Sequence, residues 1–308
     1  MDARTTDIWF GPGAKKGVFG AGVALGLQES MARGEIDSSQ FRLYGSSIGC
    51  LNAVFLATGN TGCGLSIFQE ETQKLVTASN LVPATGARII NRLTHVSRLT
   101  ASSVRVPSVL NLEHIFDVMA SRTPDIVNQL RESPIPIFAE SVDREGRFQY
   151  AELRSSAEPL QEIRHALNFV PFTGEQDADR LDSVIKGYGF SELLSGGQGP
   201  LVVVLNAKPT SRRASTLSDL VCAALSGDRR IARLYLRSRG HRRAACRDAC
   251  EADRDVFLIS PPQKVKLTDP SGFQAVHESG RLAAQRIVQF LNTVNTDVHS
   301  PRTNARTL

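Results

Sequence analysis

Short apolar runs alternate along the chain with longer segments of helical periodicity. Continuous apolar runs predict strands at residues 7–10, 41–44, 201–205 and 257–259. Two further runs, 135–142 and 147–153, flank the turn sequence DREG and predict a hairpin. Apolar positions three and four apart predict helices over 17–31, from 47 onward and over 272–292.

Strands that alternate with helices favour a largely parallel sheet covered by helices on both faces. The sequence therefore predicts a three-layer α/β/α fold, as one domain over residues 1–295 with a polar tail at 296–308. Residues 72–112 contain no Asp or Glu, and their arginines alternate with apolar side chains. We expect a basic, amphipathic cap at 80–110, although an ordinary surface helix with a loop would give the same pattern.

Composition narrows the functional classes only modestly. The net charge of +5 favours anionic partners such as membrane surfaces. The five cysteines are odd in number and form no CxxC pair, which predicts a reducing compartment and neither a disulfide framework nor a metal site. No signal peptide and no apolar run of membrane-spanning length are present. We expect a cytoplasmic protein that can associate with membranes and needs no cofactor.

The sequence Gly45-Ser46-Ser47-Ile48-Gly49 matches the pattern GxSxG between a predicted strand and a predicted helix. In such an elbow the serine hydroxyl points out of the sheet from a strained backbone, and glycines at both ends remove side chains that would collide. The pattern predicts Ser47 as a nucleophile. A glycine-rich turn without chemistry is the alternative.

A second glycine-rich loop, GPGAKKG at residues 11–17, also joins a predicted strand to a predicted helix. Free backbone N–H groups in such a loop bind either a nucleotide phosphate or the oxyanion of an acyl-transfer intermediate. The loop fits neither GxGxxG nor GxxxxGK[ST], and a serine elbow follows about thirty residues later. These observations favour an oxyanion hole.

GPGAKKGVFGAGV followed by YGSSIGCLNAVFLATG resembles the start of the patatin-like phospholipases. The resemblance implies that Ser47 is the nucleophile of a Ser-Asp dyad and that Lys15 or Lys16 holds the place of the family's basic residue. It implies amides near Gly13 and Ala14 as oxyanion donors. The whole predicted oxyanion hole comprises Gly11, Gly13, Ala14, Lys15, Lys16, Gly17 and Ile48. Pro12 departs from the family pattern and has no N–H to donate.

The family's aspartate precedes two small residues, a short helix and an apolar strand. The matching stretch here begins at Leu181-Asp182-Ser183-Val184, so the resemblance implies Asp182 as the general base. The upstream segment 165–172 resembles the family's Ala-Ser-x-Ala-x-Pro. Ser183 and Val184 stand where the family has small residues, and Asp177 and Asp179 are rival carboxylates.

The resemblance implies a lipid acyl hydrolase that cleaves carboxylic esters through an acyl-enzyme, with a lipid or acyl ester as substrate. A Ser-His-Asp esterase is one alternative, with His241 or His277 as its base. A non-catalytic membrane-binding module is another, with the arginines between residues 229 and 247 as its anionic contact. No aromatic ladder accompanies these arginines, so we expect no nucleic-acid partner.

Overall fold

The computed structural model describes residues 5–68, 112–170, 178–197, 199–207, 222–223, 226, 228–262 and 272–296. The predicted cap at 80–110 lies outside these ranges. The predicted tail at 296–308 also lies outside them, apart from its first residue, which belongs to the last helix.

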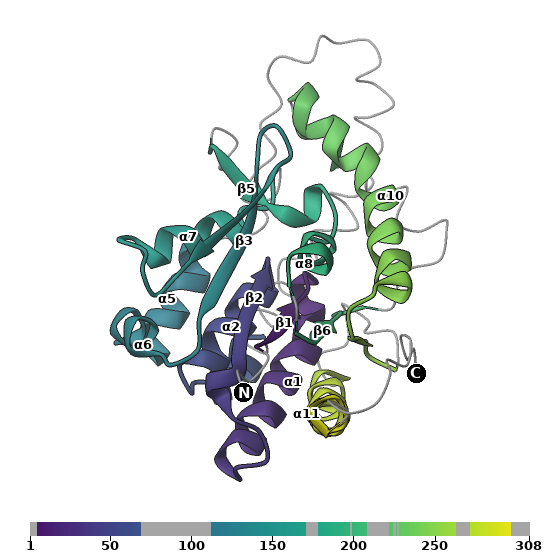
Figure 1. The fold of residues 1–308 in the computed structure, drawn as a ribbon. Coiled ribbons are helices and arrows are strands. Elements are labelled where there is room, and N and C mark those ends of the chain that lie inside the picture. The colour runs from purple at the N-terminus through teal and green to yellow at the C-terminus, as the bar shows by residue number, and fades with distance from the viewer. Residues whose placement is uncertain are drawn as a thin grey trace.

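A mixed sheet of seven strands forms the centre of the described structure (Figure 1). Its order is β4-β3-β2-β1-β6-β7, and β5 also pairs with β3. The strands β3, β2, β1, β6 and β7 run parallel, whereas β4 and β5 are antiparallel to β3. The strands are β1 Thr6–Phe10, β2 Phe41–Ser46, β3 Ile137–Asp143, β4 Phe148–Glu152, β5 Arg180–Asp182, β6 Leu201–Val204 and β7 Val256–Ile259.

Helices cover both faces of this sheet, and the side chains of β1 show the division. Ile8 and Phe10 point into the core formed with α1, α2 and α11, whereas Trp9 points into the core formed with α8 and α10. The helices are α1 Val18–Ala32, α2 Ile48–Ala57, α5 Leu112–Arg122, α6 Ile126–Glu132, α7 Pro159–Leu167, α8 Phe190–Gly196, α10 Arg229–Glu251 and α11 Gly272–Thr296. Short 3-10 helices are η1 Ala14–Gly17, η2 Ser38–Gln40 and η3 Ser183–Ile185.

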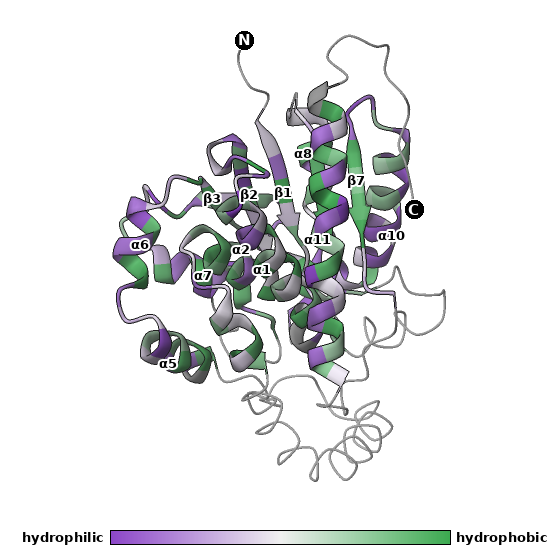
Figure 2. Ribbon diagram, turned by 90° about the horizontal axis from the view of Figure 1, so that it is seen from below, coloured by the Kyte–Doolittle hydropathy of each residue, from purple (hydrophilic) through white to green (hydrophobic). Residues whose placement is uncertain are grey.

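The predicted fold class is confirmed: a mostly parallel sheet lies between two layers of helices. Each strand and helix expected from the sequence is present, with ends displaced by at most a few residues. Figure 2 shows the basis of the pattern, because β7 is hydrophobic along its length while α11 mixes hydrophobic and hydrophilic residues. The sequence did not predict the three-residue strand β5, the helices α5 to α8 or the long helix α10.

The helix α11 packs against α1 at a very short backbone distance. A Cβ atom added at Gly22 would lie 1.9 Å from the His277 carbonyl oxygen, and one at Gly280 would lie 2.2 Å from that of Phe19. An ion pair of 2.9 Å between Arg281 Nη1 and Glu29 Oε2 joins the same two helices. The helix α1 follows the glycine-rich loop directly. Its packing against α11 therefore fixes the position of the helix at which the loop ends.

Candidate active site

Ser47 lies at the junction between β2 and α2, where the chain turns sharply. Its backbone has φ 53° and ψ −133°, and it is the one non-glycine residue with positive φ in the described structure. Such a conformation is strained for a side chain with Cβ and is typical of a functional turn. Ser47 is partly exposed, while Ser46 and Ile48 on either side are buried. The turn therefore presents one hydroxyl to the surface.

The two predicted elbow glycines lie where no side chain fits. A Cβ atom at Gly45 would lie 2.3 Å from Cys50 Cα, and one at Gly49 would lie 2.1 Å from the Phe10 carbonyl oxygen. The second contact presses the start of α2 against the end of β1. This close approach brings the elbow beside the glycine-rich loop.

Asp182 ends β5 and caps η3, and its side chain is completely buried. Its Oδ1 accepts a hydrogen bond of 3.0 Å from the Val184 N–H, and its own N–H donates to the Asn168 carbonyl, 2.9 Å away. Its Oδ2 is buried without a hydrogen-bond partner among the described residues. A buried carboxylate oxygen left without a donor is costly and is therefore a candidate for chemistry.

Ser47 and Asp182 come together through the sheet, because β2 pairs with β3 and β3 pairs with β5. Burial raises the pKa of Asp182 to about 7, and the nearby Ser47 hydroxyl and the hydrogen bond from the Val184 N–H limit the rise. No hydrogen bond of ordinary geometry joins the Ser47 hydroxyl to Asp182 Oδ2 in this structure. The hydroxyl is nevertheless close enough to favour the ionised carboxylate.

Of the two rival carboxylates, the structure describes only Asp179. Asp179 is exposed, and Asp177 lies outside the described residues.

The glycine-rich loop adopts the 3-10 helix η1, which begins at Ala14. The Gly11 N–H donates to the Val204 carbonyl at 2.8 Å, and the Lys16 N–H donates to the Gly13 carbonyl at 2.9 Å. These two amides are thus already engaged. The first N–H groups of a helix have no partner within it, which applies at the start of η1 and at Ile48, the first residue of α2. The loop amides best suited to an oxyanion are therefore those of Gly13 and Ala14.

Two buried asparagines that sequence reasoning missed brace this loop. Asn206 follows β6, donates to the Gly11 carbonyl at 2.5 Å and accepts from the Gly20 N–H at 2.9 Å. Asn52 in α2 donates to the Gly17 carbonyl at 3.0 Å. Asn206 could have been noticed as a polar residue directly after a buried apolar strand, at the edge where Ser47 lies.

The histidines weighed for a triad lie elsewhere. His277 is buried between α11 and α1, and His241 lies on α10 beside Gly187. Burial, together with Lys186 and Arg237, lowers the pKa of His241. Among the residues that the structure describes, no histidine forms a hydrogen bond with Ser47 or Asp182.

Other kinds of site are not evident in the described ranges. No group of three His, Cys, Asp or Glu side chains there could hold a metal ion. No helix in those ranges combines the length and the apolar character needed to cross a bilayer.

Comparison with known proteins gives a likeness at low identity. Neither protein-family models nor curated proteins match this sequence. A chain of the heterodimeric ExoU–SpcU complex from the type III secretion system of Pseudomonas aeruginosa aligns with 96% of this chain at 13% identity and a TM-score of 0.38. VipD from Legionella pneumophila aligns with 95% at 10% identity and a TM-score of 0.41. The alignments cover 52% and 67% of those chains, so this protein spans about half of the former. At this similarity the chemistry of the site has to be argued from its own residues.

Proposed function

We propose that this protein is a serine acyl hydrolase that cleaves carboxylic esters of lipids with a patatin-like Ser-Asp dyad. The observation that carries the proposal is the pairing of a strained, partly exposed serine with a buried aspartate whose Oδ2 lacks a hydrogen-bond partner among the described residues. A structural turn would require neither feature.

In the proposed reaction, Ser47 Oγ attacks the ester carbonyl carbon while its proton passes to Asp182. The amides of Gly13, Ala14 and Ile48 stabilise the oxyanion of the tetrahedral intermediate. The intermediate collapses to an acyl-enzyme, and the leaving alcohol takes the proton from Asp182. Water, deprotonated by the same carboxylate, then releases the fatty acid and restores the Ser47 hydroxyl.

The environment of Asp182 suits a base that acts without an imidazole. An ordinary aspartate is a weak proton acceptor at neutral pH, because its pKa is about 3.9. The buried setting raises the pKa of Asp182 to about 7, which matches its proton affinity to the working pH. The carboxylate is therefore ionised in a substantial fraction of molecules and still accepts a proton readily.

Covalent labelling with a fluorophosphonate, together with hydrolysis of a short-chain nitrophenyl ester, tests this proposal. Ser47→Ala should abolish labelling and lower hydrolysis by about a thousandfold or more, with circular dichroism unchanged. Ser195→Ala, which removes an exposed serine of α8, is the control and should behave as the parent. Undiminished labelling of Ser47→Ala would refute the assignment, and a requirement for His241 would favour a triad instead.

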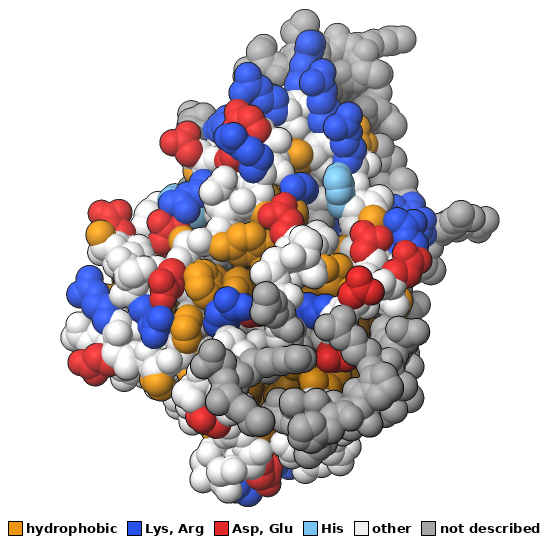
Figure 3. Space-filling view, viewed as in Figure 1, with side chains coloured by type: hydrophobic (Ala, Val, Ile, Leu, Met, Phe, Trp, Pro, Cys, Tyr) orange, Lys and Arg blue, Asp and Glu red, His pale blue; other side chains and the backbone are white. Residues whose placement is uncertain are grey.

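We also propose that the substrate lies in an anionic membrane surface that meets the outer side of α10. Four exposed arginines there form no ion pair with an acidic side chain in the described parts of the chain: Arg229, Arg233, Arg237 and Arg243. They recur at intervals of four to six residues, and Leu236 protrudes between them with 56% of its surface exposed. Figure 3 shows basic side chains gathered over α10 and the β3–β4 hairpin. Cations around a protruding apolar side chain suit an anionic lipid surface.

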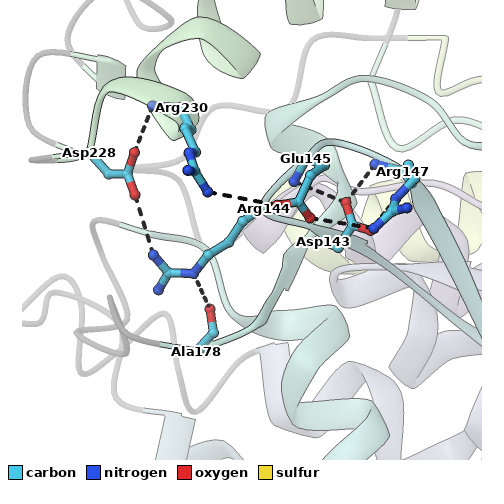
Figure 4. A network of polar contacts seen from close by, with 7 residues as sticks. All are labelled: Asp143, Arg144, Glu145, Arg147, Ala178, Asp228 and Arg230. Carbon is cyan, nitrogen blue, oxygen red and sulfur yellow. Dashed lines mark hydrogen bonds and ion pairs between the residues drawn. The ribbon is translucent and has the colours of Figure 1, made fainter.

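The start of α10 is fixed by the network of Figure 4. Asp228 caps the helix by accepting from the Arg230 N–H at 2.6 Å, and its second oxygen lies 3.3 Å from Arg144 Nη1. Arg144 in turn donates to the Ala178 carbonyl at 3.1 Å. Arg144 belongs to the turn between β3 and β4, so the arginine face is held rigidly to the sheet that carries Asp182.

Sedimentation with vesicles of phosphatidylcholine, with and without phosphatidylglycerol, tests the membrane contact. Replacing Arg233, Arg237 and Arg243 by alanine should weaken binding to the anionic vesicles by about 100-fold. The matched control removes the same charge elsewhere by replacing Arg33, Arg131 and Arg286, and should bind as the parent does. Equal losses in both variants would contradict the proposal. Vesicle binding by a protein that no fluorophosphonate labels would favour the non-catalytic module.

A further inference from the structure

A second completely buried carboxylate lies beside the proposed dyad. Glu140 belongs to β3, directly opposite Ser46 of β2. Its Oε1 accepts from the Ser183 hydroxyl at 2.5 Å, and its Oε2 accepts from the Trp9 indole N–H at 2.6 Å. No Lys, Arg or His pairs with it among the residues described. A buried acidic group without a cationic partner is rare and calls for an explanation.

The partners of Glu140 belong to the three segments that carry the proposed chemistry. Ser183 follows Asp182 directly, and Trp9 lies two residues before the glycine-rich loop. The Ser183 hydroxyl also lies 2.6 Å from that of Ser46, which precedes Ser47. One carboxylate thus connects the segments that carry the base, the oxyanion loop and the nucleophile.

The backbone is shaped to admit this carboxylate. A Cβ atom at Gly189 would lie 2.3 Å from Glu140 Cδ and from Oε2, so any other residue there would displace the carboxylate. The nearby Gly189 N–H favours the ionised form of the carboxylate and lowers its pKa. The glycine that precedes α8 therefore forms one wall of the carboxylate's binding place.

We infer that Glu140 is a positioning residue, which acts through Ser183, Ser46 and Trp9 to hold Asp182, Ser47 and the oxyanion loop in register. The inference rests on the proposed function, because it assigns a purpose to Glu140 only if Ser47 and Asp182 react. It also accounts for the buried Ser183 hydroxyl, which contacts both Glu140 and Ser46.

Glu140 acts on Asp182 electrostatically as well as through geometry. Its negative charge raises the pKa of Asp182 further, beyond the effect of burial. Burial raises the pKa of Glu140 itself to about 7, and Glu192 of α8 adds to the rise. The other titratable groups that sense these carboxylates are Cys50 and Tyr150, whose pKa values are both raised, so both stay neutral at pH 7. The charge of Glu140 thus makes Asp182 a stronger base.

Three variants of the full-length protein separate geometry from charge. Glu140→Gln keeps the shape but removes the charge, with the amide oxygen accepting from Trp9 and the amide NH2 donating to the Ser183 hydroxyl. The acid limb of the pH profile of kcat/KM should therefore move to lower pH. Glu140→Ala removes both and should lower kcat by about 100-fold with little change in KM. Ser183→Ala cuts the link to Ser46 and should lower kcat by about tenfold. Ser133→Ala is the control, because it also removes a buried hydroxyl, one that donates to the Ala57 carbonyl far from the site.

Trp9 gives a readout that does not depend on hydrolysis. It is the one tryptophan in the chain, and its indole donates to the carboxylate. Its fluorescence should titrate near pH 7 in the parent and in Ser47→Ala, and the titration should vanish in Glu140→Gln. These data distinguish the two failures. Activity that survives Ser47→Ala would overturn the proposed function. An inactive Ser47→Ala beside a Glu140→Gln with parental pH profile, kcat and Trp9 titration would overturn only the role of Glu140.

Discussion

Buried carboxylates at the two ends of the parallel strands differ in whether they have cationic partners. At the amino end, Asp7 of β1 is 1% exposed and binds two guanidinium groups, with 2.7 Å to Arg42 Nε and 2.5 Å to Arg254 Nη2. At the carboxyl end, Asp182 and Glu140 are completely buried and have no cationic partner among the residues described.

This difference separates stability from reactivity. A carboxylate that binds two guanidinium groups joins β1, β2 and the segment before β7. A carboxylate without a cation is costly to bury, and it keeps the proton affinity that catalysis requires. The unneutralised end is therefore where we place the chemistry.

The largest expected effect comes from Asp182→Asn. Hydrolysis of a nitrophenyl ester should fall by about a thousandfold, because the amide cannot accept the Ser47 proton. Stability towards urea should stay equal or increase, since an unpaired buried charge is removed. A variant that keeps parental activity would contradict the role of Asp182 as base.

The reverse result is expected at the other end. Asp7→Asn should lower the free energy of unfolding by about 3–5 kcal/mol, because it leaves Arg254 buried without its counter-charge. Specific activity of the folded fraction should stay within about twofold. Urea unfolding measures the loss, and Asp248→Asn, at an exposed pair with Arg247, serves as the control with little change. If Asp7→Asn and Asp182→Asn lowered the free energy of unfolding equally, the two ends of the strands would not differ as described.

A smaller effect is expected for a neutral group at the carboxyl end. Asn206→Ala removes both hydrogen bonds that hold Gly11 to the start of α1. The oxyanion donors should then be held less firmly, and kcat should fall between about 10-fold and 100-fold. Stopped-flow acylation measures the change. Asn128→Ala, on the exposed surface of α6, is the control, and an identical rate in both variants would contradict this account.

A further difference is expected in the pH dependence of stability. The pKa values of Asp182 and Glu140 rise from 3.8 and 4.5 to about 7 on folding, so the folded protein binds their protons more tightly. Their contribution to stability is complete below about pH 4 and is lost as the pH rises through about 7. In urea unfolding, the double variant Asp182→Asn, Glu140→Gln should lose less stability over this range than the parent. Parallel curves would show that neither group carries a raised pKa.

The sequence predicted the elements whose residues are numerous and strongly patterned. Long helices such as α1 and α11 are recognised from their helical spacing of apolar residues, and strands such as β6 from a continuous apolar run. The strand β5 has three residues, too few to show a period, although it carries Asp182. Its place in the sheet depends on antiparallel pairing with β3, which local sequence does not encode.

The same limit applies within the candidate site. Ser47, Gly45 and Gly49 were predictable because one short motif contains them. Glu140 was not, because its three contacts come from residues 9, 183 and 189, distant from it in sequence. One available signal was an acidic residue inside an apolar strand. The engagement of the Gly11 amide with Val204 follows only from the register of β1 on β6.

The glycine contact between α1 and α11 has a consequence for synthesis of the chain. During translation, residues 272–296 leave the ribosome after every strand of the sheet, so the apolar side of α1 stays uncovered until then. The glycine-rich loop before α1 can reach its final conformation only after α11 has packed against α1. The proposed active site can therefore be complete only after the last helix has docked, although Ser47 is among the first residues to be made.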